Sequence, residues 1–536
     1  MGKSKSKSKS KSVSGSVFDG RLRVQIDDVK GRSLVTQVPI SAGQLVLSEK
    51  PVAVVLATED PLATASASPC TPARLQEIAD QYSCSFELLV MVVKLHMWQQ
   101  STQQAKVEGE EGGDAVADLP LYRKEGAWLC ATVQGLAALE DHLDKQAAGW
   151  VGSLTDASHA LAGLLPGSPT PASLLSLAAK INVNSYGILS PSGSSLGFCM
   201  LPAVGLLVNH SCDPNCLYYF DFEDGTMKYR AVRGIAAGEE VTVAYIDTVM
   251  STTARGLALL STKHFRCACA RCQANQVAVQ RSLEGHSLDL LSHLELDLDL
   301  NSTSSSSSSS GGGQMNKNKK LPPTGVSVPP PVSSALLLAD AYLDGLYCHA
   351  CGSSGVVLDH GCCLLCCAKA APAAEVALAK ATAEGSGSVA VKAAKSTPTT
   401  TVRVALEQWL AQYDPGFALL AESFKVRTAA SAPPVNKKRR PLQLHPCHAL
   451  LLDALTALAS LLLHQGDVRG STACIRRSLR VMSPLLPACH PEILALQMHL
   501  ADALGTGSRE AEDLKARCAA GRALLHGVTP IAATAL

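Results

Sequence analysis

Apolar and polar residues alternate with different periods along the chain, and the change of period predicts where strands give way to helices. Residues 21–56 show short apolar runs interrupted by proline and glycine, a pattern typical of β-strands joined by turns. Over 75–180 the apolar residues recur at helical spacing. Two more strand-like runs follow at 227–232 and 241–245. The pattern predicts an α+β fold with a helical segment between two groups of strands.

The C-terminal part is rich in alanine and leucine and keeps a helical period from residue 447 onward. Breaks at 466–467 and 487–491 divide it into separate helices. Consecutive helices with short breaks look like the helix pairs of tetratricopeptide (TPR) repeats. The repeat consensus is poorly matched, so a generic helical bundle is the alternative.

Segments of low complexity separate these regions, because their composition cannot bury a core. They are a Lys/Ser tail over 1–16, a Ser-, Gly- and Pro-rich linker over 301–334, a stretch over 385–401 and a basic stretch over 429–441. In the last of these, the run 437–440 is either a nuclear import signal or part of a solvated linker.

The first residues also fit a lipidation pattern. Met1 and Gly2 followed by Ser6 match the N-myristoylation motif, and the nearby lysines would supply a second, electrostatic membrane signal. A solvated basic tail without a lipid is the simpler interpretation.

Composition narrows the class of protein. The chain has 536 residues, 47% hydrophobic and 17% charged, with a net charge of +1 and a pI near 7.5. That balance is ordinary for a globular protein and lacks the basic character of a nucleic-acid-binding domain, so no direct nucleic-acid partner is expected. The most apolar stretch, 450–463, is too short to span a bilayer, and no transmembrane span is predicted.

The 19 cysteines cluster by spacing, which favours metal ligation in a reducing compartment, cytoplasmic or nuclear, over disulfides. Cys267, Cys269 and Cys272 form a C-x-C-x-x-C group, three thiolates that can share one zinc ion. A second group has zinc-ribbon spacing and consists of Cys348, Cys351, Cys363 and Cys366. Its register is ambiguous, since Cys362 and Cys367 are neighbours of the second pair.

Three pieces of sequence, in this order, carry the strongest signal. They are the run Asn209-His210-Ser211-Cys212-Asp213-Pro214-Asn215, then Gly238-Glu239-Glu240 with Tyr245, then the C-x-C-x-x-C group. Together they resemble the core of a SET domain, in the SET and MYND-domain (SMYD-like) branch of protein lysine methyltransferases.

The resemblance implies a domain organisation. After the tail at 1–16, the SET domain covers 17–272, with N-terminal strands at 17–56, a helical insert at 57–180, a core with a knot-like C-terminal half at 181–250, and a zinc-binding post-SET segment at 251–272. The remaining parts are a linker at 273–340, a zinc ribbon at 341–370, a linker at 385–401, a helix at 402–428, a basic linker at 429–441 and an all-α TPR-like domain at 442–530.

The resemblance also implies that S-adenosylmethionine is the methyl donor and that specific residues bind it. The implied cofactor-binding residues are Lys30, Arg32, Asn184, Asn209, His210, Tyr245 and Phe265. Lys30 and Arg32 flank Gly31 in a turn that resembles the family's first cofactor contact, although an ordinary hairpin turn fits these residues equally well. Asn184 lies in a segment, 182–186, that resembles a strand of the family; a turn residue at a strand end is the alternative.

Two residues are implied to line a channel for the substrate lysine, Tyr186 and Lys263, and the hydroxyl of Tyr245 is implied to be catalytic. Lys263 departs from the family, whose members carry tyrosine there. A charged side chain at this point would narrow the channel, alter the methylation state or mark lost activity.

The resemblance supplies a fourth ligand for the first zinc ion, Cys212, so that the ion ties the post-SET segment to the cofactor loop. The second group resembles the ribbon of some SMYD-like proteins, and two structural zinc ions are expected. The family's MYND finger is not expected here, because the space for its seven or so ligands holds only Cys70 and Cys84. No partner of that finger is carried over.

The implied activity is methyl transfer to a protein lysine, on a histone or another protein. The alternative is an inactive SET scaffold that binds a peptide partner through its C-terminal helices.

Overall fold

The computed structural model describes residues 16–526 with gaps. The residues outside the description are 1–15, 18–19, 28–30, 58–69, 108–138, 191–194, 203, 284–339, 360, 365, 367–368, 397–399, 416, 422–423, 425–441 and 527–536. The basic tail, Lys30, Cys367 and the run 437–440 lie among these, so the predictions for them lie outside the described residues.

The N-terminal strands form three small sheets with strands from later in the chain. They are β1 (Ser16–Val17), β2 (Leu22–Asp27), β3 (Gly31–Thr36), β4 (Leu45–Glu49) and β5 (Ala53–Leu56). β1, β2 and β3 make one sheet, while β4 pairs with β10 and β5 pairs with β7. The strands predicted over 21–56 are confirmed.

The predicted helical insert consists of four described helices. They are α1 (Pro72–Tyr82), α2 (Phe86–Val107), α4 (Ala148–Ala162) and α5 (Pro171–Asn184). Thr71 and Thr170 cap α1 and α5 with their hydroxyls, and in both helices a proline occupies the first turn, where no amide hydrogen is needed. The apolar faces meet in one core, which includes Leu75, Leu89 and Leu154.

The second group of strands completes the sheets. It comprises β6 (Tyr186–Leu189), β7 (Ser195–Met200), β8 (Asn209–His210), β9 (Cys216–Asp221), β10 (Thr226–Ala231) and β11 (Thr242–Val243), with a short 3-10 turn η1 (Gly205–Leu207) before β8. One correction follows: residues 182–184 belong to helix α5, not to a strand. Leu177, Ala178 and Ile181 on the same helix are buried, so packing extends the helix to Asn184.

Two helices follow the strands, α6 (Thr252–Thr262) and α7 (Ala270–Leu283). The linker predicted over 273–340 is therefore wrong at both ends. α7 continues through residue 283, and Asp340 is fully buried in ion pairs with Arg255 and Arg271. The serine-rich composition in the middle of this stretch led to the prediction of a linker over its whole length.

The C-terminal part is one lobe in which the ribbon and the helices share a large core, although separate segments were predicted. It contains β12 (Leu346–Cys348), β13 (Gly352–Val357), α9 (Ala373–Ser396), α10 (Thr400–Tyr413), α11 (Phe417–Ala421), α12 (Ala449–His464), α13 (Val468–Met482), α14 (Pro491–Leu504) and α15 (Arg509–His526). Residues of the ribbon and of the helices share a hydrophobic cluster, among them Leu346, Val357, Leu406 and Leu458.

The linker predicted at 385–401 is also wrong, because α9 continues to Ser396. Its glycines suggested a flexible segment. Gly387, however, lies against the ring of Trp409 on α10, where an added Cβ would come within 2.6 Å of a ring atom. Glycine is therefore required by the close packing of two helices.

Two of the last four helices start in the same way. In α12 and α14 the residue before the helix is histidine, His448 or His490, whose side chain accepts a hydrogen bond from the amide two residues later. Each histidine follows a cysteine, Cys447 or Cys489. The predicted breaks before α13 and α14 are confirmed.

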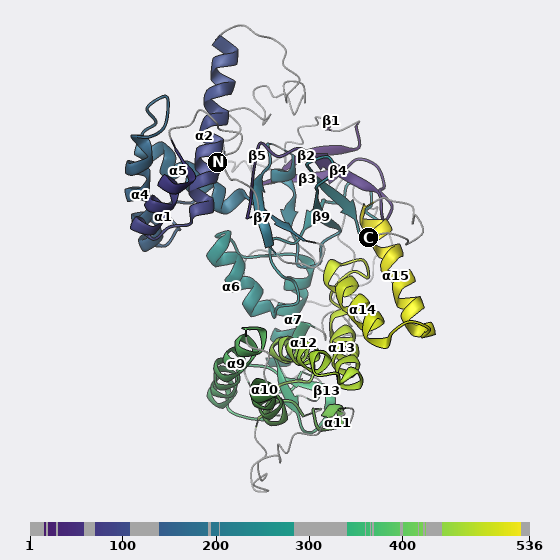
Figure 1. Ribbon diagram of the computed structural model, residues 1–536. Coiled ribbons are helices and arrows are strands. Elements are labelled where there is room, and N and C mark those ends of the chain that lie inside the picture. Colours follow the sequence, from purple (N-terminus) through teal and green to yellow (C-terminus); the bar gives the residue numbers. More distant parts are fainter. Residues whose placement is uncertain are drawn as a thin grey trace, which may run out of the picture.

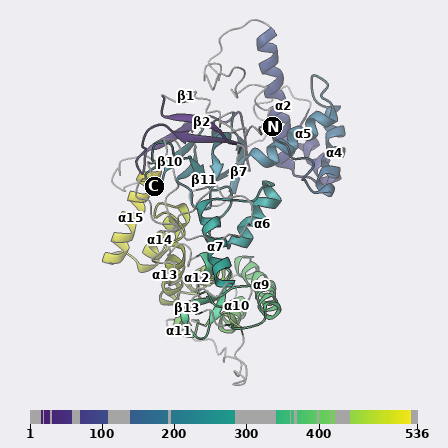
Figure 2. The same ribbon diagram turned by 180° about the vertical axis from the view of Figure 1, so that it is seen from behind.

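Figures 1 and 2 show how the parts are arranged. The helical insert lies on one side of the strands, α6 and α7 lie between the strands and the C-terminal lobe, and α14 and α15 return to the strands. Leu524 of α15 lies 3.3 Å from the position of a Cβ on Gly43, and Leu217 and Val232 pack against the α14/α15 core. The lobe thus contacts β9 and the segments around Gly43 and Val232 through α14 and α15. Among the described helices, none has the length and apolarity needed to cross a bilayer.

Candidate functional site

The parallel pairing of β8 and β11 brings two of the sequence motifs together. Asn209 pairs with Thr242 and His210 with Val243. The amide of Ser211 donates to the carbonyl of Val243 at 2.9 Å. The Asn-His run and the segment that leads to Tyr245 therefore lie side by side.

Asn209 links this pair of strands to the start of β3. Its side-chain amide donates to the backbone carbonyl of Arg32 at 2.9 Å and to the carboxylate of Glu240 at 2.9 Å. Gly31, the first residue of β3, has φ +74°, and an added Cβ would meet nothing within 4 Å. Two residues expected to bind the cofactor, Arg32 and Asn209, thus meet at the start of β3.

The ring of His210 connects the expected catalytic residue with a metal ligand. Its Nδ1 accepts a hydrogen bond from the backbone amide of Tyr245 at 3.0 Å. Burial lowers the pKa of His210 to about 4, so the ring is neutral at pH 7. A neutral ring whose Nδ1 accepts carries its proton on Nε2, which therefore donates to Sγ of Cys212 at 3.3 Å.

Tyr245 lies two residues beyond β11 and was predicted to end that strand, which stops at Val243. Its hydroxyl donates to the carbonyl of Val208 at 2.6 Å, and its ring centroid lies 5.4 Å from that of His210. Burial, followed by the charge of Glu240, raises the pKa of Tyr245, so the hydroxyl keeps its proton.

Phe265 and Lys263 approach the same place from the end of α6. The Phe265 ring centroid lies 6.2 Å from that of His210, edge to face. The ammonium of Lys263 donates to the carbonyl of Val183 at 2.7 Å and lies 5.9 Å from the ring centroid of Tyr245. Burial lowers the pKa of Lys263 to about 8.

Tyr186 is buried, and its hydroxyl donates to the carbonyl of Gly205 at 2.7 Å. Its ring packs edge to face against Tyr218 at 5.1 Å and Tyr229 at 6.1 Å. The sequence analysis missed these two tyrosines. Tyr218 on β9 and Tyr229 on β10 are paired in register. The signal that could have identified them was an aromatic residue on each of two paired strands.

Asn184 uses its side-chain amide within the insert. It donates to the carbonyls of Lys180 at 2.8 Å and Glu140 at 3.1 Å. These bonds anchor the end of α5 to the segment before α4.

The Gly-Glu-Glu turn serves the fold. Gly238 has φ +83°, and Glu239 accepts from the side chain of Asn215 at 3.1 Å and pairs with Arg233 at 2.8 Å. Asn215, the last residue of the Asn-His run, also accepts from the amide of Thr242 at 2.9 Å. The two acids therefore hold the strands that carry the site.

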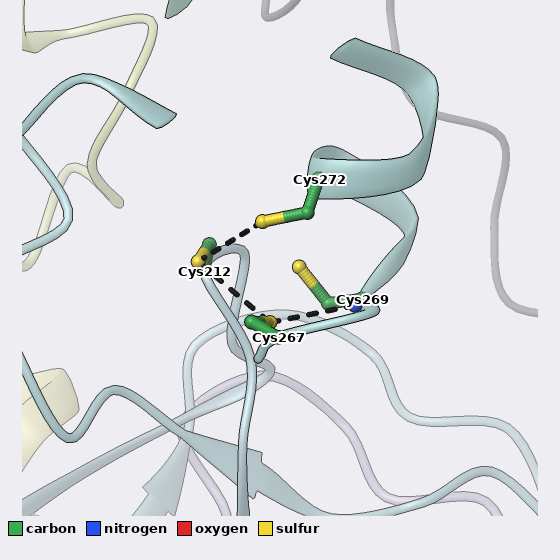
Figure 3. A group of neighbouring side chains, drawn as sticks. All are labelled: Cys212, Cys267, Cys269 and Cys272. Carbon is green, nitrogen blue, oxygen red and sulfur yellow. Dashed lines mark hydrogen bonds between the residues drawn. The ribbon is translucent and has the colours of Figure 1, made fainter. Parts of the chain in front are cut away.

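The first cysteine group gathers four sulfur atoms from two distant segments (Figure 3). Cys212 lies beside β8, whereas Cys267, Cys269 and Cys272 lie at the start of α7. Sγ of Cys212 is 3.6 Å from that of Cys272 and 3.9 Å from that of Cys267. Four ligands at about 2.3 Å around a tetrahedral zinc ion would be about 3.8 Å apart, so the group fits zinc.

The acidities within this group support the same interpretation. Hydrogen bonds from the other three thiols lower the pKa of Cys269, whereas those with Cys267, Cys269 and Cys272 raise the pKa of Cys212. Four crowded thiols cannot all ionise without a cation, and a divalent ion would remove the conflict.

The second group is local. Cys348 and Cys351 come from β12 and the turn after it, and Cys363 and Cys366 from the segment after β13. Sγ of Cys348 is 3.8 Å from that of Cys366, and Sγ of Cys351 is 3.9 Å from that of Cys363. Cys362 instead forms a backbone bridge with Lys369. The spacing again fits zinc, with Cys366 exposed.

Comparison with known proteins agrees with this geometry. Residues 31–246 match the family model of the SET domain. The chain therefore contains a SET domain.

Three relatives show which kind of SET domain it is. The histone-lysine N-methyltransferase SMYD3 of Mus musculus is 41% identical over 95 residues, 18% of this chain and 22% of the relative. The N-lysine methyltransferase SMYD2 of Homo sapiens is 35% identical over 133 residues, 25% of this chain and 30% of the relative. The SET domain-containing protein SmydA-8, isoform B, of Drosophila melanogaster is 43% identical over 74 residues, 14% of this chain and 16% of the relative. In this segment the chain is similar to SMYD proteins, and the matches span less than a third of each relative's length.

Proposed function

We propose that this protein is an S-adenosylmethionine-dependent protein-lysine N-methyltransferase. The observation that carries the proposal is the convergence of Arg32, Asn209, His210 and Tyr245, from three separate segments, at one place in the SET domain. The relatives named as lysine methyltransferases support it.

The residues that would hold S-adenosylmethionine fit its chemistry. Arg32, beside the open space at the Cβ position of Gly31, offers a cation for a carboxylate, and Phe265 beside His210 offers an aromatic face for a base. Lys30, Asn184, Asn209 and Tyr245 complete the proposed set. Bound there, the cofactor would supply an electrophilic methyl group on a good leaving group.

The chain's own residues have to deliver a neutral lysine amine. Free lysine has a pKa near 10.4, so only about one in two thousand is neutral at pH 7. An apolar channel lowers that pKa by disfavouring the ammonium form. The lowered pKa of Lys263, which lies near Tyr245, supports such a property of the surroundings. We assign Tyr245 the task of orienting the incoming amine, so that most of the rate comes from positioning.

The two zinc ions are proposed to be structural, because each group offers four thiolates and no open position. Cys212, Cys267, Cys269 and Cys272 would hold one ion, and Cys348, Cys351, Cys363 and Cys366 the other. We also propose that the SET core has knot-like threading and that the last helices are TPR-like. The domain boundaries, as corrected above, are part of this proposal.

The proposed substrate is a protein with an exposed lysine, such as a histone tail, in the cytoplasm or the nucleus. The C-terminal helices are proposed to bind a peptide partner. Tyr186 and Lys263 are proposed to line the lysine channel.

A second candidate function is an inactive SET scaffold. The observation that favours it is Lys263, whose ammonium group lies near Tyr245 and is bound to Val183. A cation at this point opposes both an incoming ammonium and the positive sulfonium of the cofactor.

Calorimetry with S-adenosylmethionine, followed by transfer of labelled methyl groups to proteins of a cell lysate, separates the two functions. The wild type is expected to bind the cofactor and label protein. Tyr245→Phe should label about a hundredfold more slowly, because the hydroxyl that orients the amine is gone.

Tyr219→Phe is the matched control, since it removes a tyrosine hydroxyl from β9, one that accepts a long hydrogen bond from Arg230 at 3.4 Å. Cofactor binding without labelling above the Tyr245→Phe level would establish the scaffold. A wild type that binds no cofactor would refute the methyltransferase.

A further inference from the structure

A buried cluster of charges joins the C-terminal lobe to the first cysteine group. The carboxylate of Asp340 lies between two guanidinium groups, and none of the three side chains is exposed. Arg255 donates to both carboxylate oxygens, at 2.6 and 2.9 Å, and Arg271 donates to one at 2.7 Å. The hydroxyl of Thr252 donates to the second oxygen at 2.6 Å.

The members of this cluster come from three parts of the molecule. Arg255 lies on α6, five residues after Met250, whose carbonyl it also binds at 2.6 Å. Arg271 lies between Cys269 and Cys272 at the start of α7. Asp340 begins the C-terminal lobe, next to Ala341.

Arg271 also reaches the loop that supplies the fourth cysteine. Its second amino group donates to the backbone carbonyl of Cys212 at 2.8 Å. A single guanidinium therefore holds Cys212 on one side and Asp340 on the other. The planar, rigid fork of arginine suits such a bridge, because its two donors keep a fixed geometry.

The charges of the cluster match those of the cysteine group. Two guanidinium groups and one carboxylate leave one positive charge, whereas four thiolates around a zinc ion carry two negative charges. Burial disfavours the Arg255 cation, but Asp340, Cys212 and Cys272 together hold its pKa above the ordinary value. Removing Asp340's charge would leave two buried cations without their shared partner.

We propose that Asp340 is a positioning residue for the SET domain: acting through Arg271 and Arg255, it fixes the Cys212 loop from the C-terminal lobe. Because His210 joins Cys212 to Tyr245, the geometry of the cofactor site then depends on the docking of the lobe. The part about the cofactor rests on the proposed function, whereas the part about the zinc site does not.

The test uses the full-length, zinc-loaded protein with Asp340→Asn, which keeps the shape of the side chain and removes its charge. We expect one of the two zinc ions to pass to excess chelator about tenfold faster, since outer-shell changes typically cost 10–100-fold in metal affinity. We also expect calorimetry to show about tenfold weaker binding of S-adenosylmethionine.

Asp414→Asn is the matched control. Asp414 is fully buried and pairs with Arg477 at 2.7 Å within the C-terminal lobe, so the substitution breaks an ion pair of the same class. It should lower the unfolding temperature but leave zinc release and cofactor affinity unchanged. If Asp414→Asn changes both as Asp340→Asn does, general loss of stability explains the effect and the proposal is overturned.

Arg271→Lys covers the case in which Asp340→Asn does not fold. Lysine keeps the buried charge but lacks the fork that bridges Asp340 and Cys212, so faster zinc release is again expected with the fold retained, as checked by circular dichroism. If a folded Asp340→Asn or Arg271→Lys protein releases zinc at the wild-type rate, the proposal is overturned. A wild type that binds no S-adenosylmethionine would refute the proposed function instead, and zinc release would still decide the role of Asp340.

Discussion

The two cysteine groups have the same ligands and similar sulfur spacing, yet they are built in different ways. The first joins Cys212 to Cys272, 60 residues later, so that two distant segments meet in it. The second is closed within residues 348–366 by two neighbouring strands and the turn after them. The first group also contacts His210, whereas the second packs against the helical core of the lobe.

This difference shows that a structural metal site can have either a local or a long-range task. Closing the second group orders one hairpin, which contributes Cys348 and Cys363 to the core of the lobe. Closing the first fixes the loop that carries Asn209 and His210 against α7. We expect the first group to control the cofactor site and the second to control the stability of the lobe.

The largest effect is expected from Cys212→Ser. The substitution removes the ligand that joins the two segments, and structural zinc contributes about 10–16 kcal/mol to the folding of small domains. The free energy of unfolding should fall by more than about 3 kcal/mol, and S-adenosylmethionine binding should be lost with one zinc ion. Metal analysis, denaturation and calorimetry measure the three changes.

Cys366→Ser is the matching change in the second group. It should also cost one zinc ion, but the affinity for S-adenosylmethionine should stay within about twofold of the wild type, because distant sites act independently. Equal loss of cofactor affinity in both variants would end the distinction between the groups.

Asn209→Ala tests whether the cofactor site depends on more than the metal. The substitution removes the bonds to Arg32 and Glu240 that link β8 to the start of β3. Calorimetry should show about tenfold weaker binding of S-adenosylmethionine, as expected for the loss of a partly buried hydrogen-bonding group. Both zinc ions should remain bound. Loss of either ion would show that this segment does not bind the cofactor and zinc independently.

Chelation of the wild type should remove the two ions at different rates. Cys366 is exposed, whereas Cys212 and Cys272 are buried, so a chelator reaches the second group more easily. The ion of the second group should be released first, and its release should hardly change the affinity for S-adenosylmethionine. A single release step, or early loss of affinity, would contradict this order.

The smallest effect concerns Lys263, near the first group. Its folded pKa is about 8, below the value of 10.5 for a free lysine. Between these pH values the unfolded chain holds the proton and the folded chain does not, so stability rises with pH across this window. Relative to Lys263→Met, the wild type should gain about 1 kcal/mol from pH 8 to pH 10, allowing for partial exposure.

Urea denaturation at the two pH values measures this difference. Lys145→Met removes an exposed lysine and serves as the control. A wild type and a Lys263→Met variant with the same pH dependence would show that Lys263 is protonated in the folded protein as in the unfolded one.

Much of the fold could be read from local pattern. The strands at 21–56, the helical insert and the breaks before α13 and α14 follow from periodicity and turn residues. The resemblance to SET domains indicated that Cys212 would join three cysteines of a later segment, and the structure gathers these four sulfur atoms.

The failures share one physical cause, which is packing against a distant partner. Residues 182–184 are helical because α5 buries its apolar face in the insert, and residues 385–396 are helical because Gly387 fits against Trp409. Asp340 was assigned to a linker, since nothing near it in sequence announces Arg255 or Arg271.

The sequence alone determined the class of domain and seven of the eight clustered cysteines, because ligand type and spacing depend on chemistry that is local to each motif. The eighth, Cys212, followed from the resemblance to SET domains. Only the tertiary structure decided that His210 links Tyr245 to Cys212, that Lys263 lies beside Tyr245, and that Asp340 holds the zinc loop. Contacts of this kind join residues far apart in the chain, and their positions are set by the packing of the whole molecule.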